Sequence, residues 1–319
     1  MALCEPDGPT PCCHEGRCRN MAAAECRCES GNCFDLRREI LAELAYWQPR
    51  ESTCKMQRFS PRKACTLLRV NGVRLVVMGD SMLRKMYQAL MIILRDNALT
   101  GSLAVNTPPE ITTECQGQAQ FTRTICGKMH LASSSRHLPS TDFCQNIKMA
   151  ASDRHFGVEF VSAQNTSTAD VALATARSLL RRKGSLLVLG IGFHDHCNAA
   201  RVIEQYLTPV VAEVRTHGQG WPKLLWVSVD HPGLLKPLPY RRLQGIERCG
   251  PFSQKIARYL ARFEVPVLNT VELTSDVSSY DGTHYAHGVN DVKVQILLNY
   301  VLELFLKMRR RTQAARVTH

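Results

Sequence analysis

Short apolar runs alternate with longer stretches of helical periodicity along most of the chain. Apolar runs of about four to eight residues predict buried strands, and apolar residues that recur every three or four positions predict amphipathic helices. The expected strands are residues 74–78, 158–163, 185–190, 223–230 and 265–269. The expected helices are residues 82–95, 168–182, 200–216, 253–263 and 289–308.

This alternation predicts an α/β domain with a central parallel sheet and helices on both faces, because a crossover helix is needed to join parallel strands. We assign residues 46–308 to this domain. Residues 1–45 form a Cys-rich N-terminal segment, residues 97–154 are expected to be a disulfide-tied insertion, and residues 309–319 are a basic tail. In such sheets a functional site is expected beyond the carboxyl ends of the strands.

Fourteen cysteines in 319 residues favour disulfide bonds and an oxidising compartment. Seven lie within the first 33 residues and seven lie after them, so complete pairing would require at least one bridge between the two regions. Zinc binding by residues 12–14, or by Cys26 and Cys28, is an alternative, although the spacings match no familiar zinc module. A glycosylation sequon at Asn165 also indicates the secretory pathway.

We expect no membrane span, because no uncharged apolar stretch approaches the roughly 18–20 residues that a transmembrane helix needs. The first 20 residues lack the apolar run of a secretory signal, which leaves the cytoplasm as an alternative to the Golgi lumen or the extracellular space. The cysteine content indicates export, whereas no signal is visible at the start of this sequence. We therefore expect that a signal or anchor precedes residue 1.

The formal net charge of +12 indicates acidic partners such as anionic glycans, a membrane surface or nucleic acid. The basic residues are mostly scattered, and the clusters at residues 181–183 and 307–316 are equally consistent with solvated helix ends. We therefore do not predict nucleic-acid binding.

Candidate chemistry begins at Gly79-Asp80-Ser81, where an expected strand meets an expected helix. The Ser81 hydroxyl would project beside the free amides of the helix N-terminus, which stabilise negative charge and suit a nucleophile. Gly79 permits a close turn, and Asp80 is expected to cap the helix or brace the loop. The alternative is that Ser81 is only a helix cap.

A serine nucleophile needs a base, and the one Asp-x-x-His pattern in the chain is formed by Asp281 and His284. Three residues of separation in a turn allow the carboxylate to bind one imidazole nitrogen, which leaves the other nitrogen to take a proton from Ser81. The pattern directly precedes the last expected helix, in a loop that could reach the nucleophile. The alternative is an exposed loop histidine without a role.

This order of motifs resembles that of the SGNH (GDSL-type) hydrolases. A narrower similarity, to the PC-esterase group, rests on Cys54, Phe59, residues 73–81 and Arg84. That group includes the trichome-birefringence-like polysaccharide O-acetyltransferases, the lumenal domain of sialate O-acetyltransferase and the neurexophilin-and-PC-esterase-domain proteins. The resemblance spans about residues 45–305, with its specific motifs at the two ends.

The resemblance implies a flavodoxin-like three-layer sandwich, the SGNH hydrolase fold. It also implies that Ser81 is the nucleophile, His284 the general base and Asp281 its orienting partner. The expected activity is that of an O-acyl esterase or O-acetyltransferase, which forms an acyl-serine and transfers an acetyl group to water or to a sugar hydroxyl. The expected partners are a glycan or other acyl ester and, for a transferase, an acetyl donor; no metal or organic cofactor is implied.

One block departs from the family pattern. Where SGNH enzymes carry a Gly-x-Asn-Asp block, residues 190–198 place a histidine at the asparagine position. His194 or Asn198 could hold the oxyanion, completed by the Ser81 amide and a glycine amide such as that of Gly192. The same run contains His, Asp and Cys side chains that invite a zinc interpretation, but neighbours in an extended chain point to opposite faces.

Two further alternatives stay open. The segment 230–232 ends an expected strand, where it either lines the substrate pocket or forms a plain loop turn. The whole domain could instead be a catalytically inactive binding or adhesion module of the secretory pathway, with the Cys-rich segment as its interaction region. The intact serine, histidine and aspartate favour the enzyme.

Overall fold

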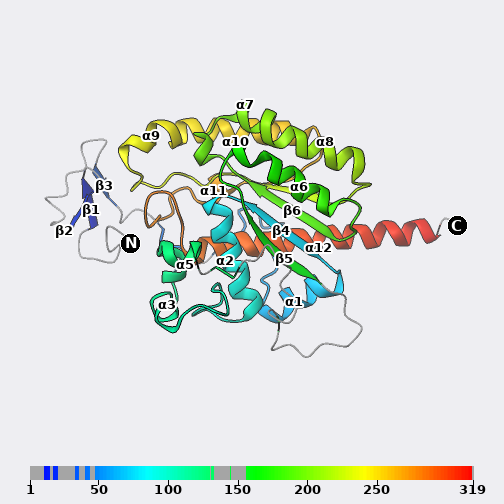
Figure 1. The fold of residues 1–319 in the computed structure, drawn as a ribbon, viewed down its shortest axis with the longest axis horizontal. Coiled ribbons are helices and arrows are strands. Elements are labelled where there is room, and N and C mark those ends of the chain that lie inside the picture. Colours follow the sequence, from blue (N-terminus) through cyan, green and yellow to red (C-terminus); the bar gives the residue numbers. More distant parts are fainter. Residues whose placement is uncertain are drawn as a thin grey trace.

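The structure is a computed structural model that describes residues 11–14, 17–20, 33–35, 40–43, 47–129, 131–132, 144 and 156–317. Its centre is a five-stranded, all-parallel sheet of order β5-β4-β6-β7-β8, which is 2-1-3-4-5 in chain order (Figure 1). The strands are β4 (Arg74–Gly79), β5 (Gly157–Ser162), β6 (Ser185–Gly190), β7 (Lys223–Val227) and β8 (Val267–Leu268). The predicted α/β fold with a parallel sheet is thus confirmed.

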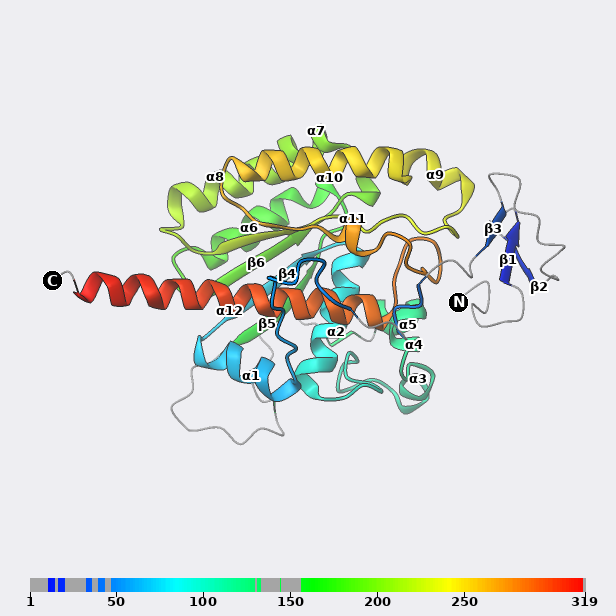
Figure 2. The same ribbon diagram turned by 180° about the vertical axis from the view of Figure 1, so that it is seen from behind.

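Helices cover both faces of this sheet, as the front and back views show (Figures 1 and 2). One face packs against α1 (Pro61–Val70), α2 (Ser81–Arg95) and α12 (His287–Val317). The other face packs against α6 (Ala169–Leu179), α8 (Thr208–His217) and α10 (Ile246–Ala261), with α7 (Ala199–Val202) and a wide turn of helix, η5 (Ile203–Leu207), leading into α8.

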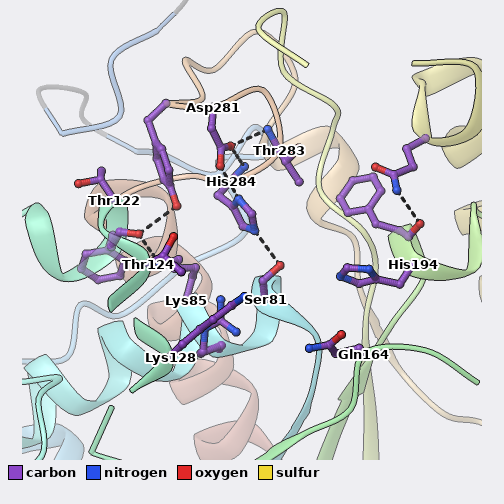
Figure 3. A pocket seen from close by; sticks show the side chains of 15 residues that line it. Ser81, Lys85, Thr122, Thr124, Lys128, Gln164, His194, Asp281, Thr283 and His284 are labelled. Carbon is purple, nitrogen blue, oxygen red and sulfur yellow. Dashed lines mark hydrogen bonds and ion pairs between the residues drawn. The ribbon is translucent and has the colours of Figure 1, made fainter. Parts of the chain in front are cut away.

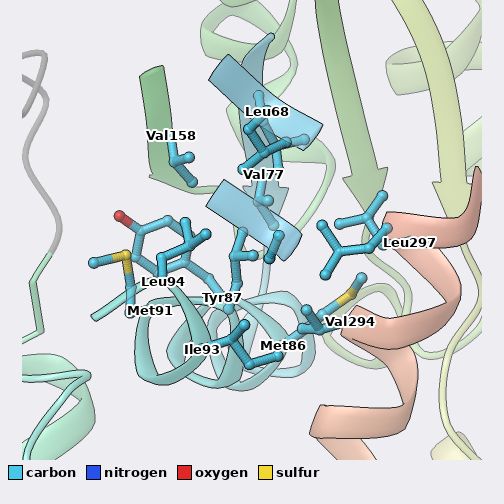
Figure 4. Close-up of a cluster of buried hydrophobic side chains, with 14 of the residues drawn as sticks. Leu68, Val77, Met86, Tyr87, Met91, Ile93, Leu94, Val158, Val294 and Leu297 are labelled. Carbon is cyan, nitrogen blue, oxygen red and sulfur yellow. The ribbon is translucent and has the colours of Figure 1, made fainter. Parts of the chain in front are cut away.

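Strand β4, which lies between β5 and β6, is buried on both sides, and this explains its continuous apolar sequence. Leu75 and Val77 face the core formed with α1, α2 and α12, part of which is drawn in Figure 4. Val76 and Met78 face the core formed with α6, α8 and α10. Because side chains alternate along a strand, an apolar run without polar interruptions is what a strand between two helical layers requires.

The connection after β4 leads to β5 on one side, whereas the connection after β6 leads to β7 on the other side. Loops after β4 and β6 therefore diverge at the carboxyl edge, and this divergence opens a crevice where α/β proteins bind ligands. Ser81 follows β4 at this crevice, and the short turn η4 (Phe193–Asp195) follows β6.

Some elements differ from the prediction. Helix α10 begins at Ile246 rather than residue 253 and contains Pro251, which a sequence pattern reads as a helix break. Helix α12 continues to Val317, so most of the basic tail extends the same helix. The remaining short elements are η3 (Thr166–Thr168), α3 (Pro109–Glu114), α4 (Ala119–Thr122), α5 (Thr124–Lys128), α9 (Leu238–Gln244) and α11 (Thr270–Leu273).

In the Cys-rich segment the described backbone forms a small antiparallel sheet of order β2-β1-β3, made of β1 (Pro11–His14), β2 (Arg17–Asn20) and β3 (Cys33–Asp35). The alternatives of zinc or disulfides for its cysteines concern side chains that lie outside the described residues. The bridge that complete pairing would require between the two halves of the cysteine set is not formed, because it would have to use Cys54, which is a free thiol.

Disulfides in the rest of the chain confirm the prediction that this protein uses its cysteines as cross-links. Cys65 pairs with Cys144, Cys115 with Cys126, and Cys197 with Cys249. The first two tie the insertion to α1 and to itself, and Cys54 is an exposed free thiol. Three disulfides favour an oxidising compartment of the secretory pathway. Within the described part of the chain, no helix is long and apolar enough to span a membrane.

Candidate active site

Ser81 is the first residue of α2, and only Asp80 separates that helix from β4. Asp80 caps the helix as predicted: its Oδ1 accepts a hydrogen bond from the Met82 amide at 2.9 Å. A Cβ on Gly79 would lie 2.2 Å from the carbonyl oxygen of Gly190, so this glycine allows the ends of β4 and β6 to approach closely. The local structure thus presents the Ser81 hydroxyl beside the free amides of a helix N-terminus.

The imidazole of His284 lies between Ser81 and Asp281 (Figure 3). Its Nε2 is 2.7 Å from Ser81 Oγ, and its Nδ1 is 2.6 Å from Asp281 Oδ2. The carboxylate holds the proton on Nδ1, which leaves Nε2 free to accept the serine proton. The structure therefore brings the three predicted residues into one hydrogen-bonded line.

The segment that carries these two residues, 281–284, is named here the acid–base turn. Asp281 Oδ1 accepts hydrogen bonds from the amides of Thr283 at 2.9 Å and His284 at 2.7 Å. Burial alone would raise the pKa of Asp281, but the hydrogen bond and charge of His284, together with these two amides, lower it below its usual range. The carboxylate therefore stays ionised and keeps the imidazole oriented.

The acid–base turn is held from behind by the backbone near Lys236. Gly282 adopts a φ of +78°, and a Cβ there would lie 1.8 Å from the backbone nitrogen of Lys236. The Gly233 amide donates to the Gly282 carbonyl at 3.0 Å, and the Lys236 ammonium donates to Thr283 Oγ1 at 2.9 Å. Glycine is the residue that fits both the backbone conformation and the space.

A cavity of about 360 Å³ opens in front of Ser81. The insertion supplies one wall, with Phe121, Thr122, Thr124 and Lys128. Loops after β5 and β6 supply the opposite wall, where Figure 3 shows Gln164 and His194 on the other side of Ser81. Residues of the insertion therefore form part of the site.

Of the three residues expected to hold an oxyanion, only one lines the cavity. His194 lines the cavity, whereas Gly192 and Asn198 are not among the residues that line it. Asn198 caps α7, where its Oδ1 accepts from the Arg201 amide at 3.1 Å. Burial lowers the pKa of His194, which favours the neutral ring with one N–H to donate.

Gln164 was not expected in the site. It follows β5 at the carboxyl edge of the sheet, and its side-chain amide faces the cavity beside His194 (Figure 3). The signal that could have found it is its position, because polar residues just after parallel strands gather at one edge. Gln164 and His194 thus line the same cavity as Ser81.

Buried charges lie next to the nucleophile. The Lys293 ammonium is 2.6 Å from Asp230 Oδ2, and both side chains are 2% exposed. The segment 230–232 therefore supports the core of the site instead of lining the cavity. Burial raises the pKa of Asp80 to about 7, and the charge of Asp230 adds to this shift.

The zinc interpretation of the run after β6 is not supported by its side chains. Cys197 is engaged in the disulfide with Cys249, and Asp195 accepts hydrogen bonds from the amide and hydroxyl of Thr166. His194 faces the cavity instead. No cluster of potential metal ligands occurs in the part of the chain that the structure describes.

No protein-family model matches the chain, and no curated protein is significantly similar to it.

Proposed function

We propose that this protein is a serine-dependent O-acyl esterase or O-acetyltransferase of the SGNH type that acts on a glycan. The observation that carries the proposal is the hydrogen-bonded line from Asp281 through His284 to Ser81, at the mouth of a cavity on the carboxyl edge of a parallel sheet. If Ser81 served only as a helix cap, it would not require a hydrogen bond to an imidazole that a partly buried carboxylate orients.

In the first half-reaction Ser81 Oγ attacks the carbonyl carbon of the acyl ester while His284 Nε2 accepts the serine proton. The carbonyl oxygen becomes an oxyanion, which the Ser81 amide stabilises with the side chains of Gln164 and His194. The tetrahedral intermediate then expels the alcohol, which takes the proton from His284. The products of this step are an acyl-serine and a free hydroxyl compound.

In the second half-reaction an acceptor hydroxyl attacks the acyl-serine while His284 removes the acceptor's proton. The bond between the acyl carbon and Ser81 Oγ then breaks, and His284 returns the proton to Ser81 Oγ. Water as acceptor gives an acid and completes ester hydrolysis, whereas a sugar hydroxyl gives a new ester. Both outcomes use the same residues, and the proposed mechanism needs no metal or organic cofactor.

Two wider expectations belong to this proposal. The strand order 2-1-3-4-5 and the two helical layers fit the flavodoxin-like SGNH fold, and the positions of Ser81 and the acid–base turn fit the PC-esterase group. The disulfides and the sequon at Asn165 fit a site of action in the Golgi lumen or outside the cell.

The test is hydrolysis of an activated acetyl ester by the purified chain and by Ser81→Ala and His284→Ala. Each substitution should lower kcat by on the order of 10³-fold or more, because the nucleophile and its base act as a unit. Ser178→Ala, at an exposed position on α6, is the matched control and should keep the wild-type rate. Full activity in Ser81→Ala, with folding verified by circular dichroism, would refute the proposal and favour a binding module.

A further inference from the structure

The cavity in front of Ser81 has a basic wall, defined by Arg84, Lys85 and Lys128. The one carboxylate that lines the cavity is Asp281, and it is bound to His284. Within the described ranges, no carboxylate forms an ion pair with any residue of the basic wall. Among the described residues, the cavity lining therefore contains more basic than acidic side chains.

The three cationic groups come from two segments that converge beside the nucleophile. Lys85 is 4% exposed, and its ammonium donates to the carbonyl oxygen of Phe121. An added Cβ on Gly127 would lie 3.3 Å from Lys85 Nζ, so this ammonium lies against α5, next to Lys128. Arg84, one residue before Lys85 on α2, has a buried Nε without a hydrogen-bond partner among the described residues. The side chains of Arg84 and of the exposed Lys128 both line the cavity, so they supply donors for a ligand.

Electrostatic interactions within the site agree with this placement. Burial, followed by the charge of Arg84, lowers the pKa of Lys85 to about 7. Burial also lowers the pKa of His194, and the charge of Lys128 acts in the same direction. Like charges that are partly removed from water destabilise one another, and a bound anion relieves this repulsion.

Building on the proposed function, we propose that the acyl-ester substrate carries an anionic group that binds the basic wall while its acyl carbonyl lies at Ser81. A carboxylate, sulfate or phosphate on the sugar supplies the required chemistry, because each accepts several charge-assisted hydrogen bonds from lysine and arginine. The net charge of +12 would assist the approach of such a substrate.

The test compares acetyl esters that differ in charge. The probes are 4-acetoxybenzoate, 4-acetoxybenzenesulfonate, 4-acetoxyphenyl phosphate and the neutral methyl 4-acetoxybenzoate, each with kcat/KM divided by its rate of hydrolysis by hydroxide. The wild type should prefer an anionic ester by about tenfold, and added salt should reduce this preference. The preferred probe among the three anions identifies the anionic group.

Lys128 is exposed, so Lys128→Met should leave folding intact and reduce the preference for the anionic ester severalfold. Lys183→Met is the matched control: this exposed lysine precedes β6 at the opposite edge of the sheet, and the preference should not change. Equal kcat/KM for charged and neutral esters in the wild type, or an unchanged preference in Lys128→Met, would overturn the inference.

A binding measurement separates this inference from the proposed function. Calorimetric titration of Ser81→Ala with 4-acetoxybenzoate and with its methyl ester reports binding without turnover. Tighter binding of the carboxylate that is lost on adding Lys128→Met supports the anion site even if no ester is hydrolysed. Equal binding of the two probes contradicts the anion site, whatever the catalytic result.

Discussion

Gly282 packs so closely against Lys236 that a Cβ on the glycine would lie 1.8 Å from the backbone nitrogen of Lys236. Together with its φ of +78°, this contact ties the acid–base turn to the segment behind it. Gly282→Ala should therefore displace His284 from Ser81 and lower kcat by about 10²-fold, since small misplacements of catalytic groups are costly. Steady-state hydrolysis of an acetyl ester measures this loss.

Gly157→Ala is the matched control for this substitution. An added Cβ at Gly157 meets nothing within 4 Å, and its backbone is not in the left-handed region. This variant should keep wild-type activity and stability. An active Gly282→Ala protein would show that the acid–base turn does not depend on this packing.

Asp281→Asn should lower kcat by on the order of 10³–10⁴-fold while the fold is retained. The neutral amide can bind the imidazole in the wrong tautomer, and it no longer stabilises the imidazolium that forms when Ser81 loses its proton. Thr283→Ala, which removes the hydroxyl bound by Lys236 but leaves the carboxylate, should have a smaller effect. A loss below tenfold in Asp281→Asn would contradict the role assigned to this carboxylate.

Asp80→Asn should change how stability depends on pH. The folded state raises the pKa of Asp80 from 3.8 to about 7, so its stabilising contribution is present at low pH and is lost as the pH rises through about 7. Asparagine caps a helix as well as aspartate and does not titrate. The decrease in unfolding free energy between pH 5 and pH 8 should therefore be about 2 kcal/mol smaller in Asp80→Asn than in the wild type.

Urea denaturation at the two pH values measures this difference. Asp80→Ala is the matched comparison, because it removes the cap together with the charge and should be about 1 kcal/mol less stable than Asp80→Asn at both pH values. An identical pH dependence in the wild type and in Asp80→Asn would contradict the placement of an ionisable carboxyl in this buried position.

The disulfide between Cys197 and Cys249 should stabilise the fold by about 2–4 kcal/mol, because it closes a long loop between the segment after β6 and α10. Replacing both cysteines by alanine removes this constraint on the unfolded chain. Cys54→Ala, at the exposed free thiol, is the control and should change the free energy of unfolding by less than about 0.5 kcal/mol. Equal stability of the double variant and the control would contradict this estimate.

Strands β4, β6 and β7 were predictable because they are buried on both faces of the sheet. Short, continuous apolar runs such as 74–78 and 185–190, which alternate with predicted amphipathic helices, are typical of buried parallel strands. Helix α1 was not predicted, although Ser60 caps it and Pro61 begins it, and both are recognisable start signals. The start of α10 was missed because Pro251 lies inside the helix instead of ending it.

The sequence allowed Asp281 and His284 to be grouped with Ser81. Ser81 directly follows a strand and the acid–base turn directly precedes the last helix, and in a parallel α/β sheet both positions can lie at the carboxyl edge of the strands. The basic wall depends instead on how the insertion folds back onto α2, which brings Lys128 to Lys85. The short helices α4 and α5 are too short for helical periodicity, and the disulfide between Cys115 and Cys126 holds this region together. Such long-range packing leaves no periodic signal in the sequence.

In the proposed mechanism, Ser81 carries the acyl group between the two half-reactions. Intact mass spectrometry after brief exposure to an activated acetyl ester measures this directly, with Ser81→Ala treated in parallel. The wild type should carry one acetyl adduct, located on Ser81 by peptide mapping, and Ser81→Ala should carry none. Absence of the adduct from the folded wild type, or an equal adduct on both proteins, would contradict the mechanism.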